Sequence, residues 1–319
     1  MKFSAILPVA RVLRRELAVT ALLLLGVSVV VFAVLYLAPG DPLNVLLEGQ
    51  SPRSIAAGAR EVLGVPQTWY GRYGAWLAKV LQGNFGNSIR TGLPVLPELA
   101  RVGVNTLVLT LGSLLFTLMI AVPIAVHAAV NGDTAGNTAA TVAAYVVSAV
   151  PVFWFGYIVV YVFINKLGMF PLLSGTATKQ PHAWLYFLVP IFVLGTASGT
   201  LAELIRHLRE ELSRVLAEDY IRTARAKGAP VWRHAFKEGF LIPVTEIMSA
   251  KIPFLLGGAV IVEQVFNWPG MGRMAWQAAQ DRDFPVIMGV ALVAAAFVRT
   301  GNLLQRVVFT MVNPRASKE

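Results

Sequence analysis

The sequence predicts an all-α integral membrane protein with six transmembrane helices. Hydrophobic residues make up 56% of its 319 residues and charged residues only 14%, whereas soluble domains average about 25% charged residues. The deficit is concentrated in six long segments that are nearly free of charge. A helix needs about 20 apolar residues to cross a bilayer core, and these segments reach that length: 17–38, 102–130, 134–165, 183–202, 239–266 and 284–312.

Two of the six segments carry Lys, Arg, Asp or Glu side chains. Arg299 and Arg306 interrupt the sixth, and three residues interrupt the fifth. Charges inside a membrane usually face a cavity or a partner, so those of the fifth segment are candidates for lining a pathway or gate. The alternative is that they reach the membrane surface or pair with a neighbouring subunit. With two aromatic residues that follow, the candidate pathway or gate consists of Glu246, Lys251, Glu263, Phe266 and Trp268.

The first segment is predicted to be an uncleaved anchor, because its apolar run is too long for a secretory signal and no small-x-small cleavage site follows it. The loop after it, residues 39–101, is predicted to be an extracytoplasmic region. Within this loop the spacing of Trp69, Tyr73 and Trp76 predicts a helix over 66–81 with the aromatic rings on one face. That face is either a docking surface for an external partner or an anchor at the lipid headgroups.

Basic residues predict the orientation, because short cytoplasmic segments of membrane proteins are enriched in Lys and Arg. The N-terminal segment 1–16 and the segment 206–240, between the fourth and fifth spans, are rich in both. Both segments are therefore predicted to be cytoplasmic, and six spans return the tail, residues 315–319, to the same side. This topology, with contact to anionic lipid headgroups, accounts for the net charge of +10, and we expect no nucleic-acid partner.

The sequence contains no pattern that supports catalysis. It has no phosphate-binding Gly-x-x-x-x-Gly-Lys-Ser/Thr loop, no His-Glu-x-x-His and no Gly-x-Ser-x-Gly. The absence of cysteine excludes disulfides, zinc–thiolate sites and iron–sulfur clusters within the chain. We therefore predict no catalytic residue, no metal site and no cofactor in this chain, so a partner must supply the energy for any uphill transport.

One polar segment in the basic loop 206–240 has the pattern of an amphipathic helix. The predicted helix covers 213–228, with Ser213 as its N-cap and Gly228 in the left-handed position after its last turn. Pro230 follows, and a second short helix is predicted over 231–240. Such a helix either lies on the membrane or fits a protein groove, which its small residues favour. Its apolar stripe is Leu212, Leu216, Tyr220 and Ala224.

The run Glu-Asp-Tyr-Ile-Arg-Thr-Ala-Arg-Ala-Lys-Gly at 218–228 resembles the cytoplasmic loop of ATP-binding-cassette importer permeases. The chain is similar to the dipeptide, oligopeptide and nickel permease family, on the subunit related to the B-type dipeptide permease. In the loop pattern Glu-Ala-Ala-x-x-x-Gly, the Glu and first Ala are replaced here. The resemblance covers nearly the whole chain, and its other motifs are residues 39–42, 83–86, 94–95, 171–175, 188–190, 266–272, 283–286 and 313–315.

Two segments depart from the family pattern. The chain between Gly228 and residues 234–236 is a few residues shorter than in the family, and residues 237–243 differ from the usual Arg-Asn-Ala-Leu-Leu-Pro form. We therefore expect a shortened second cytoplasmic helix after the 213–228 helix.

The resemblance implies a type I importer permease fold, with residues 102–314 as the permease core, in a bacterial or archaeal cytoplasmic membrane. It implies a second permease as a heterodimer partner, two ATPase subunits that bind ATP and Mg, and an extracytoplasmic solute-binding protein. Short peptides are the implied cargo, with nickel chelates, glutathione or another small solute as alternatives and a stand-alone channel or carrier as a distant one. The residues implied to couple to an ATPase are Glu218, Asp219, Tyr220, Thr223, Ala224, Ala226, Lys227 and Gly228.

Overall fold

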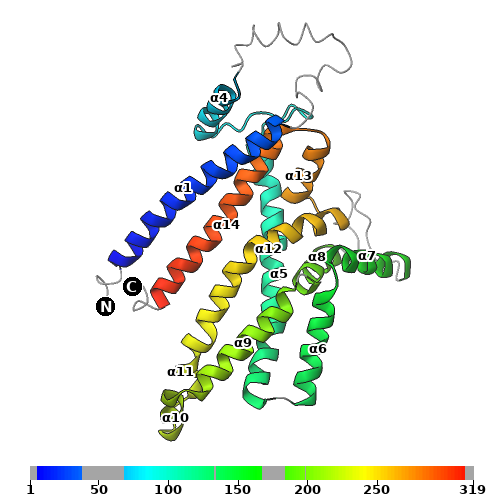
Figure 1. The fold of residues 1–319 in the computed structure, drawn as a ribbon. Coiled ribbons are helices and arrows are strands. Elements are labelled where there is room, and N and C mark those ends of the chain that lie inside the picture. The colour runs from blue at the N-terminus through cyan, green and yellow to red at the C-terminus, as the bar shows by residue number, and fades with distance from the viewer. Residues whose placement is uncertain (1–5, 38–67, 133, 167–183, 198, 313–319) are drawn as a thin grey trace, which may run out of the picture. The chain divides into compact units, whose positions relative to one another are not determined.

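The computed structural model describes residues 6–37, 68–132, 134–166, 184–197 and 199–312 (Figure 1). The predicted tail 315–319, the motifs at 39–42, 171–175 and 313–315, and most of the first half of loop 39–101 lie outside the described residues. In the described part the structure is helical, and its only β-type pairing is an isolated bridge between Asn87 and Pro94. This confirms the predicted all-α class.

The chain divides into two compact units, which are described separately below. The first unit contains Met1–Glu16, Thr106–Trp268 and Val298–Glu319. The second unit contains Leu17–Asn105 and Pro269–Phe297.

Three helices are long and apolar enough to cross a membrane on their own. They are α1 (Ile6–Leu37), α5 (Val95–Asn131) and α14 (Phe284–Val312). They correspond to the first, second and sixth predicted spans. Helix α5 begins seven residues before the predicted span at 102–130, because Val95, Leu99 and Val102 form a buried stripe at helical spacing. The predicted loop region 39–101 therefore ends inside a helix.

The third and fourth predicted spans are each two helices rather than one. Helix α6 (Ala135–Ala149) and helix α7 (Val152–Tyr161) meet at 96°. The break falls at Pro151, which has no N–H to donate and favours an extended residue before it. Helix α8 (Leu185–Ala197) and helix α9 (Thr200–Ala217) meet at 57°, and Gly199 between them has a left-handed φ of 76°.

The fifth predicted span corresponds to α12 (Ile242–Val265), of which Leu256–Val265 is a shorter apolar stretch. By length and composition, the described residues hold three helices that can cross a membrane, or up to five if each bent pair is one span. A membrane protein with several apolar helices is thus confirmed, and the count of six remains a prediction.

In the first unit, helices α5, α7, α8 and α12 share one apolar core, which includes Leu109, Val193 and Val262. Gly195 lets α8 approach α5 closely, since a Cβ atom there would lie 2.9 Å from the Ser113 carbonyl oxygen. The Thr117 hydroxyl lies 2.8 Å from the Gly195 carbonyl oxygen, to which it donates. Gly195 thus lies at a close contact between α8 and α5, whereas Gly199 precedes the start of α9. The two glycines do not form one shared helix interface.

A buried ion cluster joins α1 to α14 within the first unit. The Glu16 carboxylate is 3% exposed and lies 2.8 Å from Arg299 and 2.7 Å from Arg306. The two arginines are seven residues apart, which places them on one helix face two turns apart. The arginines that interrupt the sixth predicted span are thus neutralised in part by a carboxylate of the first helix.

In the second unit, α4 (Trp69–Leu81) packs its aromatic face on α1. The rings of Tyr73 and Trp76 lie 5.4 and 6.4 Å from the Phe32 ring, and the Tyr73 hydroxyl lies 2.8 Å from the Ser28 hydroxyl. Residues 66 and 67 of the predicted helix 66–81 lie outside the described residues. The predicted aromatic face is confirmed. Tyr73 and Trp76, two of its three aromatic residues, pack on Phe32 of α1.

Candidate coupling site

The predicted helix over 213–228 is wrong in one respect, because the chain breaks at Glu218. Helix α9 ends at Ala217, Glu218 is extended with ψ 148°, and α10 (Asp219–Ala226) begins after it. Figure 1 shows α10 as a separate short helix at the end of α9. Ser213 is therefore an exposed residue inside α9, and Glu218 takes the N-cap position. The apolar residues keep a regular helical spacing on both sides of Glu218, so the sequence pattern does not reveal this break.

The break also changes the ion pairs. The sequence pattern pairs Glu218 with Arg214 and Arg222 at a spacing of four, as in one continuous helix. In the structure Arg214 pairs instead with Glu211, and Arg222 lies 3.4 Å from Asp219. Both pairs have a spacing of three and lie within their own helix, so α9 and α10 are stabilised independently. Glu218 caps α10 through its backbone, since its carbonyl oxygen accepts from Ile221 at 3.0 Å.

The end of α10 agrees with the prediction. Gly228 has a left-handed φ of 69°, and two hydrogen bonds close the helix. The Ala229 N–H donates to Ala224 at 2.9 Å and the Gly228 N–H donates to Arg225 at 3.1 Å. This pair of bonds defines a Schellman motif. Helix α11 (Val231–Ala235) follows at once after Pro230, so α10 is a closed unit with a sharp turn on each side.

One face of α10 is held by the chain itself. Ile221 is fully buried and Ala224 is 6% exposed, and Ile221 packs with Val215 of α9 and Ala235 of α11. Ala224, predicted as a contact to an ATPase, therefore faces inward, because the second turn of α10 points its apolar side at α9 and α11. The other predicted coupling residues are exposed: Glu218, Asp219, Tyr220, Thr223, Ala226, Lys227 and Gly228.

A hydrogen bond ties α10 to the segment that leads into α12. The Tyr220 hydroxyl donates to the Glu238 carboxylate at 3.1 Å. Partial burial, and then this hydrogen bond, raise the pKa of Tyr220 above its ordinary value. Glu238 belongs to a π-helical turn, Phe236–Leu241. The predicted second helix over 231–240 is therefore a five-residue helix, α11, followed by a π-helical turn.

Gly239 brings this π-helical turn against α9. A Cβ atom on Gly239 would lie 3.1 Å from Leu212 Cδ2 and 3.3 Å from Val215 Cβ. Any larger residue would therefore force the two elements apart. Val215 also packs on Ile221 of α10, so α9, α10 and the entry to α12 meet at one small apolar cluster. Neither Glu238 nor Gly239 was predicted as functional, because their contacts depend on tertiary packing.

The structure separates the predicted pathway residues into two groups. Glu263, Phe266 and Trp268 are buried near the end of α12. Thr106 donates to Glu263 at 2.7 Å, and the Trp268 ring stacks on Tyr186 at 5.2 Å.

The second group lies nearer the start of α12. Lys251 pairs with Glu203 of α9, and Glu246 is exposed. Glu203 was not predicted, although its place in the first turn of α9 suits an acidic residue. A role for any of these side chains in a pathway remains a prediction. Among the described residues there is no group of three His, Cys, Asp or Glu side chains that could hold a metal ion.

Several apolar helices, together with a capped polar helix that has one exposed face, define a helical membrane protein. Residues 121–318 match the family described as binding-protein-dependent transport system inner membrane component. The match covers more than half of the chain, so the chain belongs to this family of importer permeases.

Curated relatives match over nearly the whole chain. It is 36% identical over 315 residues to the oligopeptide transport system permease protein AppB of Bacillus subtilis (strain 168), covering 96% of this chain and 98% of that protein. It is 32% identical over 307 residues to the glutathione transport system permease protein GsiC of Salmonella typhimurium (strain LT2), covering 95% and 97%. The predicted membership of the dipeptide and oligopeptide permeases is confirmed.

Proposed function

We propose that this chain is the transmembrane permease subunit of an ATP-driven importer that moves short peptides into the cytoplasm. The family assignment and the relative named as an oligopeptide permease support this cargo. The chain works with a homologous second permease, two ATPase subunits that bind ATP and Mg, and an extracytoplasmic solute-binding protein. Membrane lipid surrounds its apolar helices.

The orientation we propose places both termini and loop 206–240 in the cytoplasm. Six spans put loop 39–101 and the segment between the fifth and sixth spans on one side of the membrane, opposite loop 206–240. Asp283, at the end of that last segment, accepts hydrogen bonds from Ser88 and Ile89 of loop 39–101. This contact supports the parity, since two segments on opposite sides of a bilayer could not touch.

The observation that carries the proposal is the two-sided character of α10. Its buried side, at Ile221 and Ala224, holds it to α9 and α11, and its exposed side offers Asp219, Thr223 and Ala226 to a partner. We propose that α10 sits in a groove of an ATPase subunit. When the ATPases close on ATP, they displace α10, and the displacement passes through Ile221 to α9 and through Tyr220 to the start of α12.

Reconstituted complexes test this coupling. The four-subunit complex with its binding protein would be assayed in proteoliposomes for ATP hydrolysis and peptide uptake. Ala226→Arg, on the exposed side of α10, is expected to reduce uptake at least tenfold, the scale of a lost interface contact. Ala135→Arg is the matched control, an exposed alanine at the start of α6 in another predicted cytoplasmic turn. Normal uptake by the Ala226→Arg complex would exclude the coupling role.

The alternative cargo is glutathione, which relatives at 31–32% identity carry in their names. Glutathione is itself a peptide, so both readings belong to one cargo class. Competition for uptake between labelled dipeptide, labelled oligopeptide and glutathione, each with the native binding protein, would separate them. Uptake by this chain alone, without ATP, would instead indicate a stand-alone carrier.

A further inference from the structure

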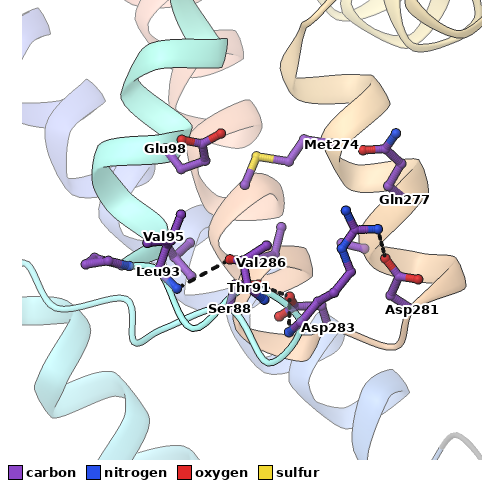
Figure 2. A pocket seen from close by; sticks show the side chains of 13 residues that line it. Ser88, Thr91, Leu93, Val95, Glu98, Met274, Gln277, Asp281, Asp283 and Val286 are labelled. Atoms are coloured by element: carbon purple, nitrogen blue, oxygen red, sulfur yellow. Dashed lines mark hydrogen bonds and ion pairs between the residues drawn. The ribbon is translucent and has the colours of Figure 1, made fainter.

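The carboxylate of Asp283 is an anchor for a loop nearly two hundred residues away. Asp283 is 3% exposed and immediately precedes α14. It accepts a hydrogen bond from the Ser88 hydroxyl (Figure 2), and two more from the Ile89 N–H at 3.1 Å and the Arg90 N–H at 3.3 Å. Removal of this buried carboxylate would leave those three donors without their acceptor.

The same hydrogen bonds fix the shape of the loop from Ser88 to Leu93. The Ser88 hydroxyl accepts from the Thr91 N–H at 3.0 Å, and the Ser88 backbone bonds both Gly92 and Leu93 at 2.9 Å. Gly92 has a left-handed φ of 71°. The loop is therefore closed on itself through Ser88, and Asp283 holds Ser88. One carboxylate determines where this loop stands against the start of α14.

The anchored loop forms one wall of a cleft in the second unit. The cleft has a volume of about 150 Å³ and lies between this loop, the first turns of α5 and helix α13 (Met271–Gln280) (Figure 2). Its floor is apolar at Val95 and Val286, and Met274 lends it an adaptable surface. Its rim is polar and partly exposed, and Arg90 and Asp281 form an ion pair across it at 3.0 Å.

The lining residues come from loops, from helix α13 and from the first turns of α5 and α14. Ser88 to Glu98 belong to loop 39–101 and the start of α5, Met274 to Asp283 to the segment between the fifth and sixth spans, and Val286 to the first turn of α14. A cargo pathway has to run along the spans, whereas all the lining residues of this cleft except Val286 lie in segments that we place outside the predicted spans. An apolar floor with a polar rim is the usual make-up of a protein contact surface.

We propose that Asp283 is a positioning residue for the solute-binding protein: it holds the Ser88–Leu93 loop and its cleft in the shape on which that protein docks. The proposal rests on the proposed function and deepens it, since it assigns the outer partner to named residues. Asp283 itself is buried and touches no partner. It acts through the loop, and the exposed rim residues Arg90 and Gln277 make the contact.

Titration of the complex with its binding protein tests the proposal. ATP hydrolysis would be followed in nanodiscs against binding-protein concentration, with and without peptide. Asp283→Ala is expected to raise the half-saturating concentration of binding protein about tenfold or more, the scale of one or two displaced interface hydrogen bonds. Hydrolysis without binding protein is measured for each variant and subtracted, so that the half-saturating concentration reports docking alone. Asp283→Asn, which keeps one acceptor oxygen, should recover part of the affinity.

Two rim variants keep the test decisive if Asp283→Ala does not assemble. Arg90→Ala and Gln277→Trp change exposed side chains without touching the buried carboxylate, and both are expected to weaken docking. An unchanged half-saturating concentration in both would overturn the proposal. A changed preference among peptides with normal docking would also overturn it and would assign the cleft to cargo. Failure of the proposed function is distinct, because the wild-type complex would then show no ATP-driven uptake.

Discussion

Helix α10 and the Ser88–Leu93 loop are held in place in opposite ways. Helix α10 is fixed by near neighbours in the sequence, since Ile221 packs on Val215 and Ala235, and Tyr220 bonds Glu238 eighteen residues on. The Ser88–Leu93 loop is fixed by Asp283, which is 195 residues from Ser88. The first region forms as soon as its own segment is made, and the second needs distant parts of the chain to meet.

This difference matches the two proposed roles. An element held by local contacts can shift as one body while the rest of the chain keeps its packing, as a coupling helix requires. A loop tied to a distant helix end keeps its shape only while both parts stay together, which suits a fixed landing surface. Two proposed partner surfaces of one chain can therefore differ in how they are held. Local contacts let one move as a unit, and long-range contacts keep the other in a fixed shape.

The largest expected effect is at the buried side of α10. Ile221→Ala removes the fully buried side chain that joins α10 to α9 and α11, at a cost of about 2–5 kcal/mol. Because the contact is local, α10 should detach while the apolar core of the first unit stays folded. Hydrogen exchange would show lost protection confined to about residues 215–238. Arg222→Ala, on the exposed side, is the control, and a global loss of protection would contradict the local character of this contact.

A smaller effect is expected from Ser88→Ala. The change removes a hydroxyl that donates to Asp283 and accepts from the Thr91 N–H, and stranded buried partners cost about 1–3 kcal/mol. The loss of hydrogen-exchange protection should extend over both segments, with faster exchange near residues 86–94 and 281–286. Ser213→Ala, at an exposed serine of α9, should change neither. Loss of protection in only one of the two segments would argue against the long-range tie.

Two glycines allow a matched test of the same motif in both regions. Gly228 after α10 and Gly83 after α4 each have a left-handed φ, close a Schellman motif and leave open space where a Cβ atom would stand. An alanine in either place costs about 1–2 kcal/mol. Thermal unfolding in detergent should show similar losses for Gly228→Ala and Gly83→Ala, but only Gly228→Ala should lower ATP-driven uptake. Equal loss of uptake in both would show a stability effect rather than coupling.

The smallest effect concerns the Tyr220–Glu238 bond, which is exposed. Tyr220→Phe is expected to cost about 0.5 kcal/mol. Because the folded state raises the pKa of Tyr220, its contribution is complete at neutral pH and is lost as the pH rises through that raised pKa. Spectroscopic titration of tyrosine absorbance, with the Tyr220→Phe variant as reference, should show that the Tyr220 phenol has a pKa above the ordinary tyrosine value of about 10. Ionisation at or below that value would contradict the partial burial of Tyr220 and its hydrogen bond to Glu238.

Features that depend on near neighbours could be predicted from the sequence. Gly228 followed by Pro230 gives a local stop signal, and the structure has the helix end there. The spacing of Tyr73 and Trp76 likewise predicts the shared face that packs on Phe32. The all-α class follows from the length of the apolar runs, because a bilayer leaves the backbone few alternatives.

Features that depend on tertiary packing could not be predicted from the sequence. The break at Glu218 accompanies the packing of Ile221 with Val215 and Ala235, and a continuous helix would satisfy the same spacing of apolar residues. The break between α6 and α7 falls at Pro151, but the angle of 96° between the two helices depends on how α7 packs on its neighbours, which include Val265 close to Gly156. The anchoring role of Asp283 needs the pairing of two loops far apart in sequence, which one sequence does not reveal.

The cluster of Glu16 with Arg299 and Arg306 has a consequence for how the chain is made. Glu16 emerges from the ribosome near the beginning of synthesis and its two arginines near the end. Until α14 is synthesised, Glu16 lacks both of these partners. The tie between α1 and α14 can therefore form only after nearly the whole chain has been made.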